Sequence, residues 1–337
     1  MKILMYGLEE WAIEYVKEKN YFDGHEVVYL EGILNGETIP EGNTDADVVS
    51  VFVDSKVDKV VIDAFPNLKM ISTRSTGFDH VDLASAKEKG IVVASVPSYG
   101  ENTVAEFAFA MLLALSRNIT EGDRRVRTEG SFDFDGLEGF DLRGRTMGVL
   151  GTGRIGKHAI SMAKGFGMNV LGYDAFPNEE LAKELGFTYA SFDELLAQSD
   201  VITVHVPYMK ETHHLVNKDA FQKMKKGMVL INTSRGSVVD TEALVDALKD
   251  GIVAKAGLDV IEVEDVAKDE VVFYTEKDMS NEETRLMLAN HILINMPNVM
   301  VQPHNAFNTK EAKIRIIETT ADNIGSFIKG ESVNVVK

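Results

Sequence analysis

The stretch Met147-Gly-Val-Leu-Gly-Thr-Gly-Arg-Ile-Gly156 decides how this 337-residue chain folds. Its apolar start belongs to a predicted strand, Thr146 to Leu150, and its end opens a predicted helix that runs through about Gly165. A second strand is predicted over Asn169 to Tyr173, and it ends at Asp174. A strand, a Gly-x-Gly-x-x-Gly turn, a helix and a second strand in this order are typical of a dinucleotide-binding unit.

The three glycines of this turn have separate physical roles. Gly151 permits the tight turn, Gly153 lets backbone amides approach a pyrophosphate, and Gly156 lets the helix pack close to the strand. The helix N-terminus then presents N–H groups and the positive end of a dipole to the phosphates. Glycine turns without a ligand are common, but the flanking strands favour dinucleotide binding here. The predicted contacts in this turn are Gly151, Thr152, Gly153, Arg154, Ile155 and Gly156.

Asp174 bears on which dinucleotide binds. It lies eighteen residues after Gly156, close to the spacing of ~20 at which a carboxylate accepts hydrogen bonds from the adenosine ribose. A carboxylate at this position repels the 2′-phosphate of NADP, and the following Ala175-Phe-Pro177 contains no arginine to neutralise it. NAD is therefore the predicted cofactor.

Composition disfavours several other classes of protein. The chain has 35 Lys and Arg against 53 Asp and Glu, and its net charge of −18 disfavours binding to nucleic acid or to an anionic membrane. The apolar run Phe107 to Leu115 is shorter than the ~20 residues of a membrane span, and the N-terminus lacks the pattern of a signal peptide. The absence of cysteine excludes disulfides and thiolate ligands, and no metal site is predicted. We expect a cytoplasmic protein with a locally cationic site for any anionic substrate.

Short apolar runs alternate with helical patterns along most of the chain. In residues 1–99 the predicted strands are Lys2 to Tyr6, Glu26 to Leu30, Val48 to Phe52, Met70 to Thr73 and Ile91 to Ala94. From Met147 onward the alternation adds predicted strands at Val201 to Val206, Met228 to Asn232, Ala254 to Leu258 and Val299 to Val301. This alternation predicts an α/β protein with doubly wound parallel sheets. A length of 337 residues suggests roughly two domains.

Three further segments bear on the organisation of the chain. Arg74-Ser-Thr-Gly-Phe-Asp-His80 is either a ligand-binding loop at a strand end or a glycine turn with Asp79 or Asp82 capping the next helix. Glu101 to Arg117 predicts a helix that is apolar on several sides, which indicates burial between domains or between subunits. Gly130 to Gly139 predicts a surface loop.

Four polar residues follow predicted strands of the second half, namely Arg235, Asp259, Glu264 and His304. The carboxyl ends of parallel strands are where such sheets bind ligands. An arginine in a Ser-Arg-Gly turn directly after an apolar strand favours a site over a surface ion pair, and its guanidinium can grip a carboxylate in a bidentate fork. Arg235 therefore supplies the cationic anchor that an acidic protein needs for an anionic substrate.

Glu264 and His304 indicate a functional site only when they are considered as a pair. Alone, His304 is an ordinary loop histidine and Glu264 is one more solvated acid in the run Glu262 to Asp265. Together they suggest a carboxylate that favours the imidazolium form, and a histidine protonated near neutral pH can donate a proton to a carbonyl. The adjacent His213 and His214 lie in a polar stretch and are assigned to the surface.

The chain resembles the D-isomer-specific 2-hydroxyacid dehydrogenase family over nearly its whole length, and within it the D-lactate dehydrogenase branch. The motifs that carry the resemblance are Arg74-Ser-Thr-Gly-Phe-Asp-His80, Tyr99-x-x-Asn102-x-x-Ala-Glu106, Gly148-Val-Leu-Gly-Thr-Gly-Arg-Ile-Gly156, His205-Val-Pro207, Asn232-Thr-Ser-Arg-Gly236 with Val239-Asp-Thr241, Gly257-Leu-Asp-Val-x-Glu-x-Glu264 and Pro303-His-x-Ala-Phe307. Their number and their order argue against a chance match.

The resemblance implies two doubly wound α/β domains with a cleft between them. A Rossmann NAD-binding domain would comprise residues 100–307, and a discontinuous, flavodoxin-like substrate domain would comprise residues 1–99 and 308–337. It also implies a homodimer that packs through helix 101–117.

The resemblance further implies residue roles. Arg235 would bind the substrate carboxylate and polarise the keto oxygen, His304 would be the acid/base, and Glu264 would orient the histidine. The remaining implied cofactor contacts are Asp174, His205, Val206, Pro207, Thr233, Ser234, Arg235 and Asp259. The implied substrate contacts are Thr76, Gly77, Tyr99, Arg235, His304 and Phe307.

The predicted function is reversible, NAD-dependent reduction of a 2-keto acid such as pyruvate to the (R)-2-hydroxy acid. Some positions depart from the family pattern, among them Gly100-Glu101, where Ser-Pro is usual, and Asn305 and Asn308 around the motif of His304. These departures leave the substrate side chain open. The alternatives are a hydroxypyruvate/glyoxylate or phosphoglycerate dehydrogenase and, from a different class, an NAD(H)-sensing interaction protein of the same fold.

Overall fold

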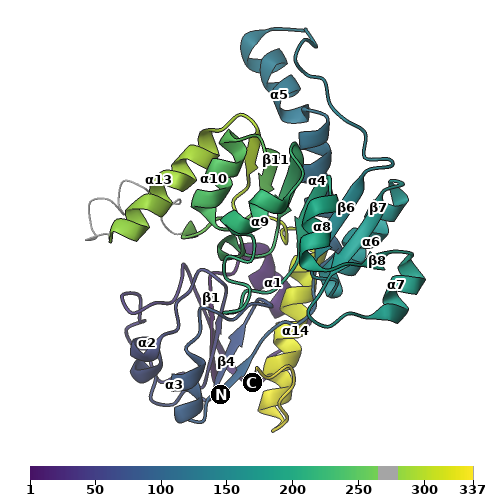
Figure 1. The fold of residues 1–337 in the computed structure, drawn as a ribbon. Helices are drawn as coiled ribbons and strands as arrows, with labels where there is room; N and C mark the ends of the chain where they lie inside the picture. Colours follow the sequence, from purple (N-terminus) through teal and green to yellow (C-terminus); the bar gives the residue numbers. More distant parts are fainter. Residues whose placement is uncertain (265–279, 337) are drawn as a thin grey trace. The chain divides into compact units, whose positions relative to one another are not determined.

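Two compact units make up the chain in the computed structural model, which describes residues 1–264 and 280–336. One unit comprises Met1–Gly100 and Asn308–Lys337, and the other comprises Glu101–Phe307. Each unit is built on a parallel sheet with helices on its faces, as the α/β pattern predicted (Figure 1). The first unit includes Gly100, one residue beyond the predicted boundary at residue 99, and the second begins with the long helix α4 (Glu101–Ser116).

In the first unit, five strands are ordered β2-β1-β3-β4-β5, and every neighbouring pair is parallel. The strands are β1 (Lys2–Tyr6), β2 (Glu26–Leu30), β3 (Val48–Val51), β4 (Met70–Thr73) and β5 (Val92–Ala94). This is the flavodoxin-like order of a doubly wound sheet, in which the strand order reverses between β1 and β3. Ligands of such sheets bind beyond the carboxyl ends of the strands near this point.

Apolar helix faces cover both sides of this sheet. The helices are α1 (Glu10–Lys19), α2 (Lys59–Ala64), α3 (Leu83–Glu88) and α14 (Lys310–Ile328). α1 and α14 share one buried cluster with the strands, around Met5 and Ile317, while α2 and α3 contribute to the cluster around Val49. The backbone N–H of Val336 donates to the carbonyl of Val93 at 2.9 Å. The C-terminal segment is therefore an integral part of the first unit.

In the second unit, seven parallel strands are ordered β12-β11-β10-β9-β6-β7-β8. The strands are β6 (Thr146–Leu150), β7 (Asn169–Tyr173), β8 (Thr188–Tyr189), β9 (Val201–Val204), β10 (Met228–Asn232), β11 (Val253–Leu258) and β12 (Val299–Val301). Starting from the glycine-rich strand β6, the chain winds outward in one direction through β7 and β8 and then in the other through β9. This is the Rossmann order, extended by one strand.

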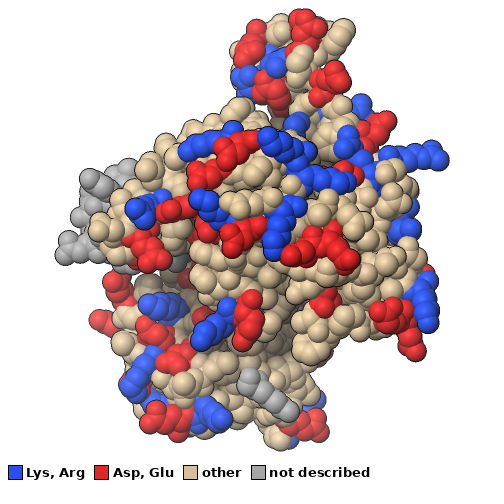
Figure 2. Space-filling view, viewed as in Figure 1, with Lys and Arg blue, Asp and Glu red and all other residues tan. Residues whose placement is uncertain are grey.

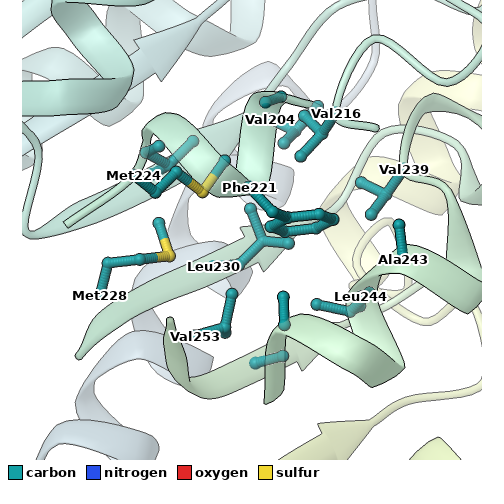
Figure 3. Packing of buried hydrophobic residues seen from close by; sticks show 14 of the residues in the cluster. Val204, Val216, Phe221, Met224, Met228, Leu230, Val239, Ala243, Leu244 and Val253 are labelled. Atoms are coloured by element: carbon teal, nitrogen blue, oxygen red, sulfur yellow. The ribbon is translucent and has the colours of Figure 1, made fainter. Parts of the chain in front are cut away.

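Helices on the two faces of this sheet bury separate clusters. The helices are α4 (Glu101–Ser116), α6 (Arg154–Gly165), α7 (Glu179–Leu185), α8 (Phe192–Gln198), α9 (Lys218–Lys223), α10 (Thr241–Lys249) and α13 (Asn281–Asn295). α4, α6 and α7 pack on one cluster, and α8, α9, α10 and α13 pack on the other. In the second cluster the ring of Phe221 lies among Val216, Leu230 and Val239 (Figure 3). This dense core holds the carboxyl ends of the strands in fixed positions.

A helical projection that the sequence did not predict follows α4. α5 (Ile119–Arg124) continues into a π-helical segment, Arg125–Glu129, and the pair extends away from the sheet of its unit (Figure 1). The loop after it carries two exposed aromatic side chains, Phe132 at 96% exposure and Phe134 at 82%. The surface loop predicted at Gly130 to Gly139 is confirmed. Among the described ranges, no helix combines the length and the apolar character needed to cross a membrane.

Charged side chains of both signs mix on the surface. On the face drawn in Figure 2, Lys and Arg are interspersed with Asp and Glu. Exposed ion pairs such as Lys223–Asp193 at 2.8 Å and Arg127–Asp123 at 2.7 Å contribute little to stability individually. Attraction of an anionic substrate must therefore come from charges at the site itself.

Candidate active site

The fold requires glycine at two positions of the glycine-rich turn between β6 and α6. Gly151 has a φ of +91°, and a Cβ added there would lie 2.7 Å from the carbonyl oxygen of His205. A Cβ added at Gly156 would lie 1.9 Å from the carbonyl oxygen of Gly151. Neither clash can be relieved without moving backbone, so both glycines are structural requirements of the turn.

Gly153 differs, because the protein itself does not require glycine there. No atom lies within 4 Å of a Cβ added at Gly153, and its φ of −69° suits any residue. Gly153 is also the N-cap of α6 and provides no side chain to cap the helix. Open space beside an N-terminus without a side-chain cap is what a bound pyrophosphate needs.

Asp174 and the glycine-rich turn are joined directly. Asp174 Oδ2 accepts hydrogen bonds from the backbone N–H of Thr152 at 2.7 Å and from its hydroxyl at 3.1 Å. The hydroxyls of Thr152 and Tyr189 lie 2.7 Å apart, and the Tyr189 hydroxyl accepts the N–H of Asn178 at 3.0 Å. Asp174 is thus held at the end of β7, where a carboxylate would meet an adenosine ribose.

Two buried polar atoms beside the predicted cofactor site have no hydrogen-bond partner among the described residues. They are Nδ1 of His205, after β9, and the hydroxyl of Thr233, after β10. His205 Nε2 lies 2.9 Å from the Thr203 hydroxyl, and burial lowers the pKa of His205 to about 4, so the ring is neutral at pH 7. Unpaired buried polar atoms are costly, and a ligand with polar groups would pair them. Together with Gly153 and Asp174, they fit a dinucleotide.

Three of the predicted site residues follow three neighbouring strands. Arg235 comes after β10, Asp259 directly after β11 and His304 after β12. Asn232 pairs with Leu258, and Leu258 pairs with Val301, so these strands end side by side. The side chain of Asn232 donates to the carbonyl of Arg235 at 3.0 Å, and a guanidinium nitrogen of Arg235 donates to the carbonyl of Ser234 at 2.8 Å.

Asp259 organises the loop that carries His304. Its carboxylate accepts the backbone N–H groups of Asn305 at 2.8 Å and Ala306 at 3.0 Å, and its carbonyl accepts the N–H of His304 at 2.8 Å. Burial raises the pKa of Asp259, and the two amide hydrogen bonds oppose that rise. His304 itself has a φ of +51°, an uncommon conformation for histidine, which these bonds help to hold.

The side chains of Glu264 and His304 lie in contact, as the sequence predicted. His304 Nδ1 lies 2.9 Å from Glu264 Oε2, and about a third of each side chain is exposed, 32% and 30%. With Nδ1 facing the carboxylate, Nε2 is the ring nitrogen available to a substrate. A ring nitrogen placed in this way can exchange a proton with an oxygen atom of a ligand. The catalytic roles of these residues and of Arg235 remain predictions.

The structure corrects one other assignment. His214 is not a free surface residue, because its Nε2 lies 2.8 Å from Oε1 of Glu262, and Glu262 is buried at 5% exposure. Glu262 begins the acid run that ends at Asp265. Asp265, the end of that run, lies outside the described residues. His213 is exposed, as predicted, and stacks on His214 with ring centroids 4.0 Å apart.

In the first unit, the Arg74–His80 segment follows β4 and is tightly folded. Asp82, and not Asp79, caps α3 by accepting the N–H of Ser85 at 3.0 Å. The hydroxyl of Thr76 donates to the carbonyl of Val96 at 2.8 Å, and the hydroxyl of Ser75 donates to the carbonyl of Gly77 at 2.6 Å. The predicted substrate contacts of this unit are Thr76, Gly77 and Tyr99, and those of the second unit are Arg235, His304 and Phe307. These contacts stay predictions.

Known proteins share both the sequence and the fold. Residues 109–306 match the sequence profile described as "D-isomer specific 2-hydroxyacid dehydrogenase, NAD binding domain". The D-lactate dehydrogenase of Escherichia coli is 35% identical over 337 residues, or 98% of this chain and 98% of that protein. A glyoxylate reductase of Korarchaeum cryptofilum is 36% identical over 299 residues, or 88% of this chain and 83% of that protein. The structure of D-lactate dehydrogenase from Aquifex aeolicus, complexed with NAD and lactic acid, is 38% identical with a TM-score of 0.85, covering 98% of this chain and 96% of that one.

The profile matches more than half of the chain, and these relatives match most or nearly all of it. The two parallel sheets and the glycine-rich turn agree with the same assignment. The chain therefore belongs to the D-isomer-specific 2-hydroxyacid dehydrogenase family, and it is an NAD-dependent oxidoreductase that acts on CH–OH groups.

Proposed function

We propose that this enzyme is a D-lactate dehydrogenase, which reversibly reduces pyruvate to (R)-lactate. The observation that carries the proposal is the contact of 2.9 Å between Glu264 and His304 at the end of β12, two strands from the arginine that follows β10. It is supported by likeness to proteins named D-lactate dehydrogenase over 98% of this chain.

Arg235 would serve as the anchor for the substrate carboxylate and would stabilise the charge that develops on the keto oxygen. A guanidinium binds a carboxylate through two parallel hydrogen bonds. One preorganised donor of this kind is worth roughly 3–4 kcal/mol of transition-state stabilisation. The other proposed substrate contacts are the backbone amides of Thr76 and Gly77 and the side chains of Tyr99 and Phe307.

His304 would deliver the proton. In reduction, its Nε2–H is donated to the keto oxygen, and in oxidation the neutral Nε2 accepts the hydroxyl proton. Glu264 would hold the ring through Nδ1 and so keep Nε2 turned toward the substrate. Bound NADH supplies the hydride that the keto carbon accepts. Asp174 would bind the adenosine ribose, and Asp259 would lie near the nicotinamide.

The test is NADH oxidation with a panel of keto acids, comparing the wild type with Arg235→Gln. The panel comprises pyruvate, 2-ketobutyrate, 2-ketoisocaproate, phenylpyruvate, oxaloacetate, 2-ketoglutarate and hydroxypyruvate. We expect turnover of pyruvate or a near homologue, and a loss in kcat/KM of at least about 100-fold in the variant, with NADH binding unchanged. Arg285→Gln, which changes an exposed arginine of α13, is the matched control. Retained activity in Arg235→Gln would refute the anchor, and a silent panel with NADH still bound would favour an NAD(H)-sensing protein.

A glyoxylate reductase is the second candidate, because a protein of that name is 36% identical over 88% of this chain. Its substrate carries a hydrogen where pyruvate carries a methyl group, so the side-chain pocket separates the two functions. Adding glyoxylate to the panel decides between them. A kcat/KM for glyoxylate above that for pyruvate would overturn the first proposal in favour of the second.

We also propose a homodimer that packs through α4. On this helix the exposed or half-exposed positions Glu106, Ala110 and Leu113 recur at helical spacing, so one face is not covered by its own unit. The exposed Phe132 and Phe134 lie on the projection that follows. Large apolar side chains gathered at a surface commonly mark an interface.

A cytoplasmic location remains our expectation from composition.

A further inference from the structure

Two histidine–carboxylate pairs depend on one short loop after β11. Glu264 contacts His304 at 2.9 Å, and Glu262 contacts His214 at 2.8 Å. The pairs differ in burial, since 30% of the Glu264 side chain is exposed against 5% of the Glu262 side chain. The proposed function uses only Glu264. A buried carboxylate two residues away is costly and calls for its own explanation.

Both oxygens of the Glu262 carboxylate are occupied. Oε2 accepts the backbone N–H of Thr241 at 3.1 Å and its hydroxyl at 2.7 Å, while Oε1 faces Nε2 of His214. Thr241 is the first residue of α10, where the helix dipole also favours a negative charge. Glu262 therefore ties its loop to the start of α10 and to the loop that carries His214.

The backbone around Glu262 is held as firmly as its side chain. The Glu262 carbonyl accepts the side-chain amide of Asn290, on α13, at 2.7 Å. A Cβ added at Gly236 would lie 2.0 Å from the carbonyl oxygen of Ile261, so this loop rests directly on the turn that follows Arg235. The segment before Glu264 thus has fixed contacts on α10, on α13 and on the Arg235 turn.

Val263, between the two glutamates, has a φ of +54°. For a β-branched residue this left-handed conformation is a steric outlier that costs of the order of 1–3 kcal/mol. Such strain persists only where the flanking residues hold it. Glu262, which precedes Val263, is held by the contacts just described. Glu264, which follows Val263, is held by its contact with His304.

We propose that Glu262 is a positioning residue, which keeps Val263 in its strained conformation and thereby aims Glu264 at Nδ1 of His304. His214 is its partner in this role. Without the anchor, Val263 relaxes to an ordinary φ, and Glu264 turns away from the imidazole. The inference rests on the proposed acid/base role of His304, but it assigns to Glu262 and His214 a function that neither has in that proposal.

The test is a double-mutant cycle with a rescue. We expect Glu262→Ala to lower kcat for pyruvate reduction at least about 10-fold, which is part of the ~10²–10⁴ that a general acid contributes. It should also shift the midpoint of the pH dependence of kcat/KM in the same direction as Glu264→Ala. The double variant Glu262→Ala/Glu264→Ala should have the same kcat as Glu264→Ala alone, because both changes act through the contact between Glu264 and His304. Adding Val263→Gly to Glu262→Ala should restore part of the loss, because glycine adopts the left-handed conformation without strain.

Several comparisons separate positioning from simple stability. Glu262→Gln keeps an acceptor for Thr241 and should retain more activity than Glu262→Ala. Asp240→Ala removes the N-cap of the same helix, and it should lower the thermal midpoint while leaving kcat unchanged. If Glu262→Ala does not fold, His214→Ala replaces it in the cycle. Losses that multiply in the double variant, or an unchanged pH midpoint, would overturn the proposal.

A measurement without turnover keeps this inference separate from the proposed function. The C2 proton of His304, assigned through His304→Gln, can be followed by proton NMR as pH is varied. In Glu262→Ala its titration midpoint should move toward that in Glu264→Ala. Failure of the wild type to reduce any keto acid would refute the proposed function alone, whereas an unmoved His304 titration in Glu262→Ala would refute the role of Glu262.

Discussion

The backbone N–H of Thr152 donates to Oδ2 of Asp174 at 2.7 Å, so the acid that ends β7 also holds the second residue of the glycine-rich turn. In the proposed dinucleotide site, one carboxylate would thereby be connected to both the ribose position and the phosphate turn. Any change at Asp174 should affect cofactor affinity through both routes.

Asp174→Ala should weaken NADH binding by roughly 10- to 100-fold, because a charged hydrogen-bond acceptor is lost and the Thr152 amide is released. NADPH should lose much less affinity, because the repulsion of its 2′-phosphate disappears at the same time. Fluorescence titration with both nucleotides measures the ratio. Glu179→Ala, an exposed acid on nearby α7, is the control. An unchanged ratio of the two affinities would contradict the assignment of Asp174.

Gly153→Ala and Gly156→Ala should separate ligand binding from folding. Gly153→Ala should keep the thermal midpoint, because nothing lies within 4 Å of the new methyl group, yet weaken NADH binding at least ~10-fold. Gly156→Ala brings a methyl group 1.9 Å from the Gly151 carbonyl and should cost at least about 1–3 kcal/mol of stability. Thermal unfolding and NADH titration of both variants provide the test. Equal NADH affinity in Gly153→Ala and the wild type would show that no phosphate approaches this residue.

His205 should make stability depend on pH. Burial lowers its folded pKa to about 4, below the ordinary value of 6.5, so between these values the unfolded chain binds a proton that the native state does not. The free energy of unfolding should therefore fall as pH drops through this window, by on the order of 1–3 kcal/mol from this group. Urea unfolding at about pH 7 and about pH 5 measures the slope. His205→Gln should show a smaller drop than the wild type, and an equal drop would assign the dependence to other groups.

Ala110→Arg should dissociate the proposed homodimer. Ala110 is exposed on α4, so the long charged side chain does not disturb the core of its own unit but would be buried in an interface. Sedimentation at several concentrations would show a dimer for the wild type and a monomer for the variant. Lys183→Glu, on α7 away from this face, should leave the assembly unchanged. A wild-type monomer at all concentrations would remove the dimer proposal.

Local patterns were sufficient for most of the fold. β6, α6 and β7 could be predicted because an apolar strand, three glycines and a helical stripe lie within one continuous stretch, Met147 to Tyr173. The two-residue strand β8 has no pattern long enough to detect. α5 has 6 residues and buries none of them, so no apolar stripe in the sequence indicates it.

The sequence indicates a candidate site residue where a polar side chain comes shortly after an apolar strand. Arg235 and Asp259 could be identified in this way. The pairing of Glu262 with His214 could not, because 48 residues separate them and consecutive acids give no sign of which one is buried. The left-handed conformation of Val263 could not be predicted either, because β-branched residues rarely adopt a positive φ.

The return of α14 to the first unit has a consequence for how the protein is made. Ile317 and its neighbours on this helix complete a cluster with Met5 and Val16, and the amide of Asn323 donates to the Ser95 carbonyl at 2.9 Å. A ribosome therefore finishes all strands of the second unit before it supplies the last helix of the first. Until then α1 alone covers this face of the N-terminal sheet, and part of its apolar surface stays exposed, as in the folding intermediates that chaperones bind. A chain that stops before Asn308 loses part of a core and not merely a tail.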